Sequence, residues 1–249
     1  MWTRFKRWFH QWGAPPIFVR RMDAMMPWLF GMGVLGLVVG WSWGLFWAPV
    51  DYQQGNSYRI IFLHVPAASL AMGAYALMAI NAVVGLVWNI KVCFSVMRAI
   101  APLGLAFAVI CLVSGSLWGK PTWGTYWVWD MRLTSMLIFA FLYAGFIGLD
   151  SALGRNKAGD TVCALLAIVG VVMLPIIKYS VEWWATLHQG STFKVVGESS
   201  MDISMLVPFL ISMFGAYCWF GAMVCWYSKW KVIHSQARSS WLRDYWASP

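Results

Sequence analysis

Six apolar stretches that contain no Asp, Glu, Lys or Arg divide this chain of 249 residues. Each stretch approaches or exceeds the roughly 17 residues that a helix needs to cross a bilayer. Lipid accepts only helices or closed barrels as spanning structures, and the alternating pattern of barrel strands is absent from the sequence. The sequence therefore predicts an all-α polytopic membrane protein with six transmembrane helices, over residues 27–47, 66–88, 99–118, 133–148, 161–177 and 203–227.

The composition also favours a membrane environment. Hydrophobic residues make up 61% of the chain and charged residues only 11%, whereas soluble proteins average about 45–50% and about 25%. The six stretches carry no embedded charge of the kind that marks an ion path, which argues against an ion-coupled transporter. The sequence has no internal repeat and no long linker, so we expect residues 1–249 to form a single membrane domain.

The lysine and arginine residues predict the orientation of the chain. Thirteen of the 18 fall in the N-terminal segment, the second and fourth loops and the C-terminal tail, and five fall in the other loops. By the positive-inside rule both termini are expected to be cytoplasmic, with residues 1–26 as an interfacial segment and 228–249 as a tail. The formal net charge of +9 lies on that side, so topology explains it and we expect no nucleic-acid partner.

Glycine recurs at every fourth position in the first span, at Gly36, Gly40 and Gly44. Small residues at this spacing form a stripe along one helix face and let a neighbouring backbone approach closely. The stripe predicts close helix packing, either within the chain or against another subunit.

The stretch "WGKPTWGTYWVWD" places four tryptophans and a tyrosine between Trp118 and Asp130. We expect residues 118–130 to form an extracytoplasmic loop. Aromatic residues also form belts at membrane interfaces, so composition alone leaves both a ligand-binding surface and a belt open. The aromatic residues concerned are Trp118, Trp123, Tyr126, Trp127 and Trp129, with Trp183 and Trp184 in the loop after the fifth span.

Asp130 stands just before the fourth apolar stretch. A carboxylate at the start of a helix accepts hydrogen bonds from the free N–H groups and meets the positive end of the helix dipole. The position therefore predicts first of all a helix cap.

Two histidines fall in loops that the predicted topology places on the same outer side. The 23 residues from Pro66 to Trp88 suffice to span the membrane, so we expect His64 to lie just outside that helix, at the membrane boundary. His188 follows the fifth span by about ten residues, and if that segment is helical it shares a face with Trp184. The other two histidines, His10 and His234, are expected to be ordinary cytoplasmic surface residues.

Two imidazoles beside a tryptophan-rich surface suit a flat, apolar ligand, and haem fits that description. Imidazole nitrogens bind haem iron axially, aromatic rings cover the porphyrin, and cations pair with the propionates, for which Arg59 and Arg132 are candidates. Two other classes remain open. A b-type cytochrome subunit would normally hold its histidines inside the helices, and a purely structural membrane subunit would use the aromatic residues as a belt.

The sequence also resembles a known family. "WGTYWVWD" resembles the WWD signature of haem-handling membrane proteins, and "HVPAA" and "EWWATLHQGSTF" resemble the histidine segments of the CcmC family of cytochrome c maturation. The resemblance covers essentially the whole chain. It implies that His64 and His188 are axial ligands of non-covalent haem b. The implied haem-contacting surface is the loop from Trp123 to Asp130, with Trp123, Gly124, Tyr126, Trp127, Trp129 and Asp130. Further candidates are Trp118, Arg59, Arg132, Trp183 and Trp184.

The resemblance further implies the partners and the location. It suggests a complex with the ABC transporter subunits CcmA and CcmB and the small subunit CcmD, and delivery of haem to the chaperone CcmE. The setting it implies is the bacterial inner membrane. The chain contains no P-loop, so ATP hydrolysis is expected in a partner, and we expect no catalytic residues and no enzyme activity of its own.

Overall fold

The computed structural model describes residues 10–188 and 201–247. Almost all of these residues are helical, and no strand occurs among them. Six helical segments of the described chain are long and apolar enough to cross a membrane. The prediction of an all-α protein with six membrane-spanning helices is therefore confirmed.

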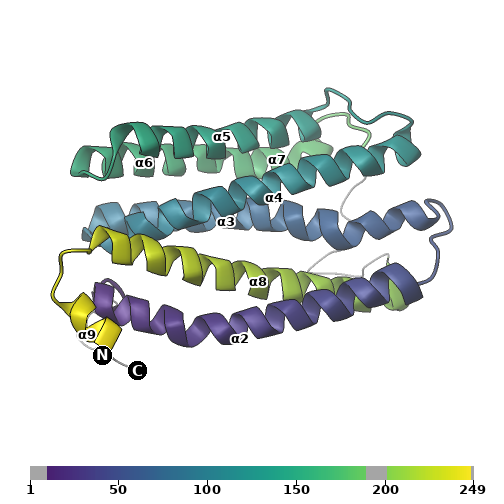
Figure 1. The fold of residues 1–249 in the computed structure, drawn as a ribbon. Helices are drawn as coiled ribbons and strands as arrows, with labels where there is room; N and C mark the ends of the chain where they lie inside the picture. The colour runs from purple at the N-terminus through teal and green to yellow at the C-terminus, as the bar shows by residue number, and fades with distance from the viewer. Residues whose placement is uncertain (1–9, 189–200, 248–249) are drawn as a thin grey trace, which may run out of the picture.

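The six spans run side by side (Figure 1). The short 3-10 helix η2 (Asn56–Ile60) runs directly into the helix of the second span, and the short helix α9 (Trp241–Ala247) follows the last span. The spans are built from α2 (Pro15–Ser42) with the π-helical turn η1 (Trp43–Trp47), α3 (Ile61–Trp88), α4 (Lys91–Trp123), α5 (Met131–Leu153), α6 (Lys157–Val169) with η3 (Gly170–Val172) and α7 (Met173–Trp183), and α8 (Ile203–Ser235).

The helices form three layers in the view of Figure 1, with α3 and α4 between the α2–α8 pair and the layer of α5, α6 and α7. The described ends of the chain lie together at one end of the bundle, as an even number of spans requires. The connection between α4 and α5 lies at the opposite end. The cytoplasmic location of the termini stays a prediction.

The helices extend beyond the charge-free stretches because the charges at their ends find partners. Residues 15–26 belong to α2, so the first helix begins well before the predicted start of its span at residue 27. Asp23, inside α2, pairs with Lys229 at 2.7 Å and accepts a hydrogen bond from the hydroxyl of Tyr245 at 2.7 Å. Burial and this hydrogen bond raise the pKa of Tyr245 to about 12. The contacts join α2, α8 and α9 at one end of the bundle.

Two glycines of the stripe, Gly36 and Gly40 of α2, pack inside the chain against α8. A Cβ atom at Gly36 would lie 2.7 Å from the Cα of Gly215, and one at Gly40 would collide with Ser212. Real Cβ atoms do not approach other atoms so closely, so glycine is what allows the two helices to touch. Of the two alternatives that the sequence left open, the described chain shows the internal one.

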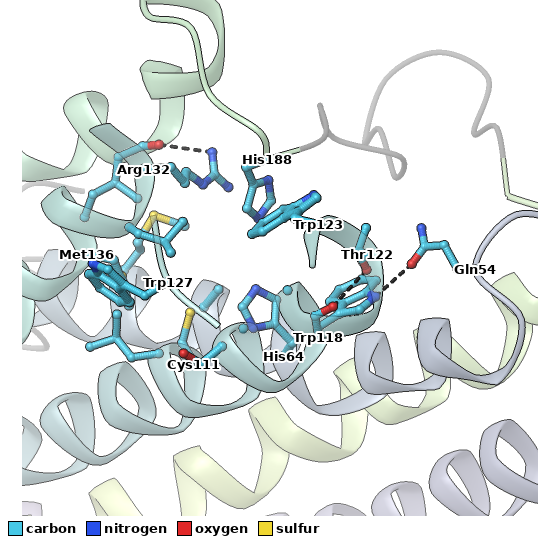
Figure 2. A pocket seen from close by; sticks show the side chains of 18 residues that line it. Gln54, His64, Cys111, Trp118, Thr122, Trp123, Trp127, Arg132, Met136 and His188 are labelled. Atoms are coloured by element: carbon cyan, nitrogen blue, oxygen red, sulfur yellow. Dashed lines mark hydrogen bonds between the residues drawn. The ribbon is translucent and has the colours of Figure 1, made fainter. Parts of the chain in front are cut away.

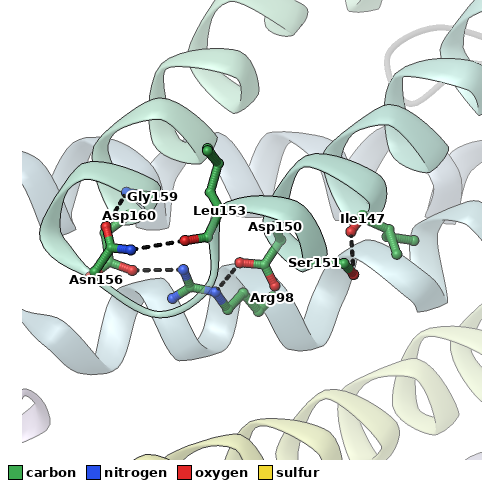
Figure 3. Close-up of polar contacts among 8 residues, drawn as sticks. All are labelled: Arg98, Ile147, Asp150, Ser151, Leu153, Asn156, Gly159 and Asp160. Carbon is green, nitrogen blue, oxygen red and sulfur yellow. Dashed lines mark hydrogen bonds and ion pairs between the residues drawn. The ribbon is translucent and has the colours of Figure 1, made fainter.

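A buried arginine joins three helices at the end of the bundle where α5 and α6 connect (Figure 3). Arg98 of α4 donates through Nε to Asp150 of α5 at 2.5 Å, and its Nη2 lies 2.7 Å from Asp160 of α6. Asn156 caps α6 by accepting from the main-chain N–H of Gly159 at 2.9 Å. The side chain of Arg98 is 5% exposed and the two carboxylates are 19% and 23% exposed, so removing either aspartate destabilises the fold by leaving a buried charge with one partner fewer.

Candidate functional site

A pocket lies where α3 begins and α4 ends (Figure 2). This end of the bundle is opposite the connection between α5 and α6 (Figure 1). Side chains of α3, α4, α5 and α7 line it, together with the connection between α4 and α5 and the segment after α7. Its lining residues include Gln54, His64, Trp118, Trp123, Trp127, Arg132, Met136 and His188.

His64 lies within α3, because the helix begins at Ile61 rather than at Pro66. The expectation that His64 precedes the helix is therefore wrong. Proline inside a helix leaves the carbonyl four residues earlier without its usual N–H partner. Here that carbonyl belongs to Phe62, and the indole Nε1 of Trp41 donates to it at 3.1 Å. This contact from α2 explains how α3 can include Pro66. His64 consequently lies on the first turn of α3.

The imidazole of His64 is packed against α4. Its Nδ1 lies 3.1 Å from the hydroxyl oxygen of Ser114, and its ring meets Trp118 edge-on at 5.7 Å between ring centres. A Cβ atom at Gly115 would lie 2.9 Å from Cε1 of His64, so glycine makes room for the ring. The histidine side chain is buried, with 9% of its surface exposed.

His188 lies beyond the end of α7, which stops at Trp183. Trp184 is extended rather than helical, so the hypothesis that Trp184 and His188 share a helix face is wrong. The main-chain N–H of His188 donates to Oγ1 of Thr186 at 3.1 Å, and this hydroxyl in turn donates to Oδ2 of Asp130. The segment that carries His188 is thereby attached to the start of α5.

Asp130 caps α5, as predicted, because its Oδ1 accepts from the main-chain N–H of Leu133 at 2.8 Å. Its second carboxylate oxygen accepts the hydrogen bond from Thr186. One carboxylate therefore stabilises the helix start and the position of the His188 segment at the same time.

The two histidine rings approach each other across the pocket (Figure 2). Their centres are 6.4 Å apart and their planes are inclined by 33°. Two imidazoles that bind one metal atom from opposite sides place their ring centres roughly 6 Å apart, given metal–nitrogen bonds of about 2 Å. The spacing therefore suits one metal atom between His64 and His188.

The tryptophans divide into two groups. Trp118 and Trp123 lie on the last turns of α4, so the expectation of a loop over all of residues 118–130 is wrong at its start. These two and Trp127 line the pocket, and Trp123 lies beside His188 with 6.0 Å between ring centres. The other group, which we call the outward aromatic group, is exposed and absent from the pocket lining: Tyr126, Trp129, Trp183 and Trp184.

The indole nitrogens of the pocket tryptophans differ in their partners. Nε1 of Trp118 donates to Oε1 of Gln54 at 2.7 Å (Figure 2). Nε1 of Trp127 is buried and has no hydrogen-bond partner within the described ranges 10–188 and 201–247. Gly124 ends α4 with a φ of 80°, which glycine adopts without strain. Its role is therefore to let the chain turn at the end of the helix.

The two candidate arginines have different positions. Arg132 lines the pocket and donates through Nη1 to the main-chain oxygen of Ile177 at 3.2 Å. Arg59 is not among the lining residues. Its guanidinium donates to the main-chain oxygens of Gly44 and of Ala48, the latter at 2.8 Å, and so closes the end of the first span.

Comparison with known proteins identifies the family. The model of a family described as CcmC, heme exporter protein C, matches residues 8–243. The chain belongs to the CcmC family. A relative named heme exporter protein C from Escherichia coli (strain K12) is 52% identical over 206 residues, which cover 83% of this chain and 83% of the relative. Proteins with the same name from Haemophilus influenzae and Bradyrhizobium diazoefficiens are 46% identical over 216 residues and 42% identical over 197 residues. These alignments cover 86% and 79% of this chain and 88% and 74% of the relatives.

The bacterial members of the CcmC family and the six apolar helices identify this chain as a multi-pass inner-membrane protein.

Within the site, several residues carried no sequence signal that would have singled them out. Ser114, Gly115 and Thr186 are common residue types, and only the fold brings each of them to a histidine or to its segment. Gln54 likewise reaches Trp118 from a distant part of the chain.

Proposed function

We propose that this member of the CcmC family binds haem b non-covalently between His64 and His188 on the extracytoplasmic face and delivers it to the chaperone CcmE for cytochrome c maturation. In this proposal it acts as a subunit of a complex with CcmA, CcmB and CcmD. The observation that carries the proposal is the 6.4 Å separation of the two imidazole centres in a pocket lined by tryptophan.

The donor set favours haem over a bare metal ion. Among the described residues no group of three or more His, Cys, Asp or Glu side chains could hold a metal ion. A protein metal site normally needs three or four such ligands, whereas haem brings four nitrogens of its own and needs only axial ligands from the protein. Two imidazoles are therefore sufficient for haem and insufficient for a typical metal centre.

The other lining residues suit the rest of the haem molecule. Trp118, Trp123 and Trp127 offer flat apolar surfaces, and Met136 adds a polarizable side chain. Arg132 provides the positive charge for a propionate. Asp130 acts in this proposal through Thr186, by holding the His188 segment in place.

Ultraviolet–visible spectra of the purified protein test the two-histidine site. We expect His64→Ala and His188→Ala each to lose the six-coordinate low-spin spectrum and to retain less haem, with much less in the double variant. Imidazole added to either single variant should partly restore the spectrum. His234→Ala is the matched control, because this histidine packs against Trp230 at the other end of α8. Unaltered spectra in both single variants would show that the iron ligands come from elsewhere.

The outward aromatic group provides a surface on which the chaperone can dock beside the pocket. Trp129 is 77% exposed and Trp183 is 55% exposed, which leaves their rings available to a partner. We expect the double variant Trp129→Ala and Trp183→Ala to keep its haem spectrum but to lose co-purification with haem-bearing CcmE. Trp123→Ala is the contrasting variant, because it should weaken haem retention itself. Full recovery of the complex with the double variant would mean that these rings only form a membrane belt.

The alternative of a b-type cytochrome subunit predicts a different behaviour of the same preparation. Such a subunit would keep its haem when apo-chaperone is added and would cycle reversibly with a quinol. Loss of haem to apo-CcmE without quinol oxidation supports delivery.

A further inference from the structure

We propose that Ser114 is a positioning residue that fixes the tautomer of His64, so that Nε2 is the nitrogen available to iron. The inference rests on the haem site proposed above and adds a residue from α4 that lies outside both histidine segments and outside the tryptophan signature. It follows from the number of protons that the three neighbouring groups can share.

The hydroxyl of Ser114 has a single proton. Its Oγ lies 2.6 Å from the main-chain oxygen of Ile110, 3.3 Å from that of Cys111 and 3.1 Å from Nδ1 of His64. The shortest contact has the length of a strong O–H···O hydrogen bond, so the hydroxyl donates to Ile110. Oγ is then left with lone pairs toward the histidine, and Nδ1 of His64 must be the donor.

A neutral imidazole has one N–H and one lone pair. If Nδ1 carries the proton, the lone pair is on Nε2, the nitrogen farther from α4. Histidines that bind metals commonly donate their other N–H to a fixed acceptor, which sets the tautomer, orients the ring and increases the basicity of the ligand nitrogen. The Ser114 hydroxyl has the position of such an acceptor, and the main-chain oxygen of Cys111, one helical turn earlier, is a second acceptor for the same imidazole.

The surroundings of the ring are buried and closely packed. Ser114 is 5% exposed and His64 is 9% exposed, so bulk water does not compete for Nδ1. The neighbouring Gly115 meets the Cε1 edge of the imidazole, where a Cβ atom would lie only 2.9 Å away. Two successive residues of one helix therefore hold the ring, one by a hydrogen bond and one by close contact.

The first test uses the protein without haem. With ¹⁵N-labelled histidine at about pH 8, well above the usual histidine pKa of about 6.5, the nitrogen chemical shifts report which nitrogen carries the proton. The signal of His64 is assigned by its loss in His64→Ala. We expect the Nδ1–H form in the wild type and in Ser114→Thr, which keeps a hydroxyl, and a larger share of the Nε2–H form in Ser114→Ala.

Ser212→Ala is the matched control for this series. Ser212 is fully buried in α8 and donates to the main-chain oxygen four residues earlier, Pro208, at 2.8 Å, as Ser114 does to Ile110. Loss of this hydroxyl removes the same kind of intrahelical bond, and among residues 10–188 and 201–247 Ser212 makes no hydrogen bond to a histidine. We expect Ser212→Ala to leave the His64 nitrogen signals unchanged.

The second test uses the haem-loaded protein. Loss of such an outer hydrogen bond typically weakens metal binding by about 10- to 100-fold, and we expect roughly 10-fold faster loss of haem from Ser114→Ala, with a more positive reduction potential because the ligand is less basic. Ser114→Thr should restore both properties. The proposal is overturned if Ser114→Ala keeps a single Nδ1–H tautomer and loses haem at the rate of Ser212→Ala. Because the nitrogen spectra need no haem, a wild type that failed to bind haem would refute the proposed function and leave the tautomer measurement intact.

Discussion

Trp127 brings to the pocket a hydrogen-bond donor that no described residue uses. A buried donor without an acceptor costs about 1–3 kcal/mol, so such groups are rare unless a ligand supplies the partner. Trp118, which also lines the pocket, already donates to Gln54. At the residue scale we therefore expect the Trp127 N–H to be available to an oxygen of the bound molecule, such as a haem carboxylate.

Trp127→Phe tests this expectation, because phenylalanine keeps an aromatic ring but has no N–H. A hydrogen bond to a charged group contributes about 1.5–3 kcal/mol, so we expect haem affinity to fall by roughly 10-fold or more. Trp129→Phe is the control, since Trp129 is exposed and contacts Trp127 only through its ring. The measurement is a haem titration of the apo-protein followed by absorption. Equal affinities of the two variants would contradict the expectation.

Residue types alone predicted part of this pocket and could not predict the rest. His64, His188 and Arg132 stand out in the sequence as ligand or cation candidates, and the fold places all three on the pocket. Ser114 does not stand out, because a serine within a helix is common and its contact with His64 spans 50 residues of sequence. The sequence also did not distinguish inward from outward tryptophans, because that depends on where α4 ends and how the following connection turns.

At the scale of single elements, a charge-free stretch defines the part of a helix that lies in lipid and not its full length. α4 runs from Lys91 to Trp123, well beyond the predicted 99–118, because Arg98 pairs with two aspartates at one end. α3 continues through Pro66 because Trp41 supplies a donor from another helix. Tertiary contacts of this kind decide where helices end, and the sequence of a single segment does not reveal them.

The contact between α2 and α8 depends on glycine, and a matched pair of substitutions tests it. A methyl group at Gly40 would collide with Ser212, whereas one at Gly31 meets nothing within 4 Å. We expect Gly40→Ala to lower the free energy of unfolding by about 1–3 kcal/mol, as overpacking does. Gly31→Ala should leave it unchanged or raise it by up to about 1 kcal/mol, because alanine has the higher helix propensity.

Thermal unfolding of the two glycine variants in detergent provides the measurement. A lower melting temperature for Gly40→Ala than for Gly31→Ala is the expected result. Equal melting temperatures would mean that the two helices separate without cost at this position. Both substitutions lie in α2, so differences in membrane insertion are kept small.

At the scale of the whole molecule, the two ends of the bundle carry different chemistry. The pocket end contains the histidines, the tryptophans and Arg132, and the other end contains the ionic cluster of Arg98 and the contacts of Asp23. The described ends of the chain lie at the second end (Figure 1). The excess of lysine and arginine in the loops at that end predicts that it faces the cytoplasm and that the pocket faces outward.

Cysteine labelling in spheroplasts tests this orientation for the molecule as a whole. Tyr52, 91% exposed in the connection between α2 and α3, reports on the pocket end, and Arg155, exposed between α5 and α6, reports on the opposite end. Four of the five native cysteines are buried, and replacing the fifth, Cys93, with serine keeps labelling of native cysteines low. We expect Tyr52→Cys to react with an impermeant thiol reagent in intact spheroplasts and Arg155→Cys to react only after the membrane is opened. The reverse pattern would place the pocket on the cytoplasmic side and contradict the proposed delivery of haem on the outer face.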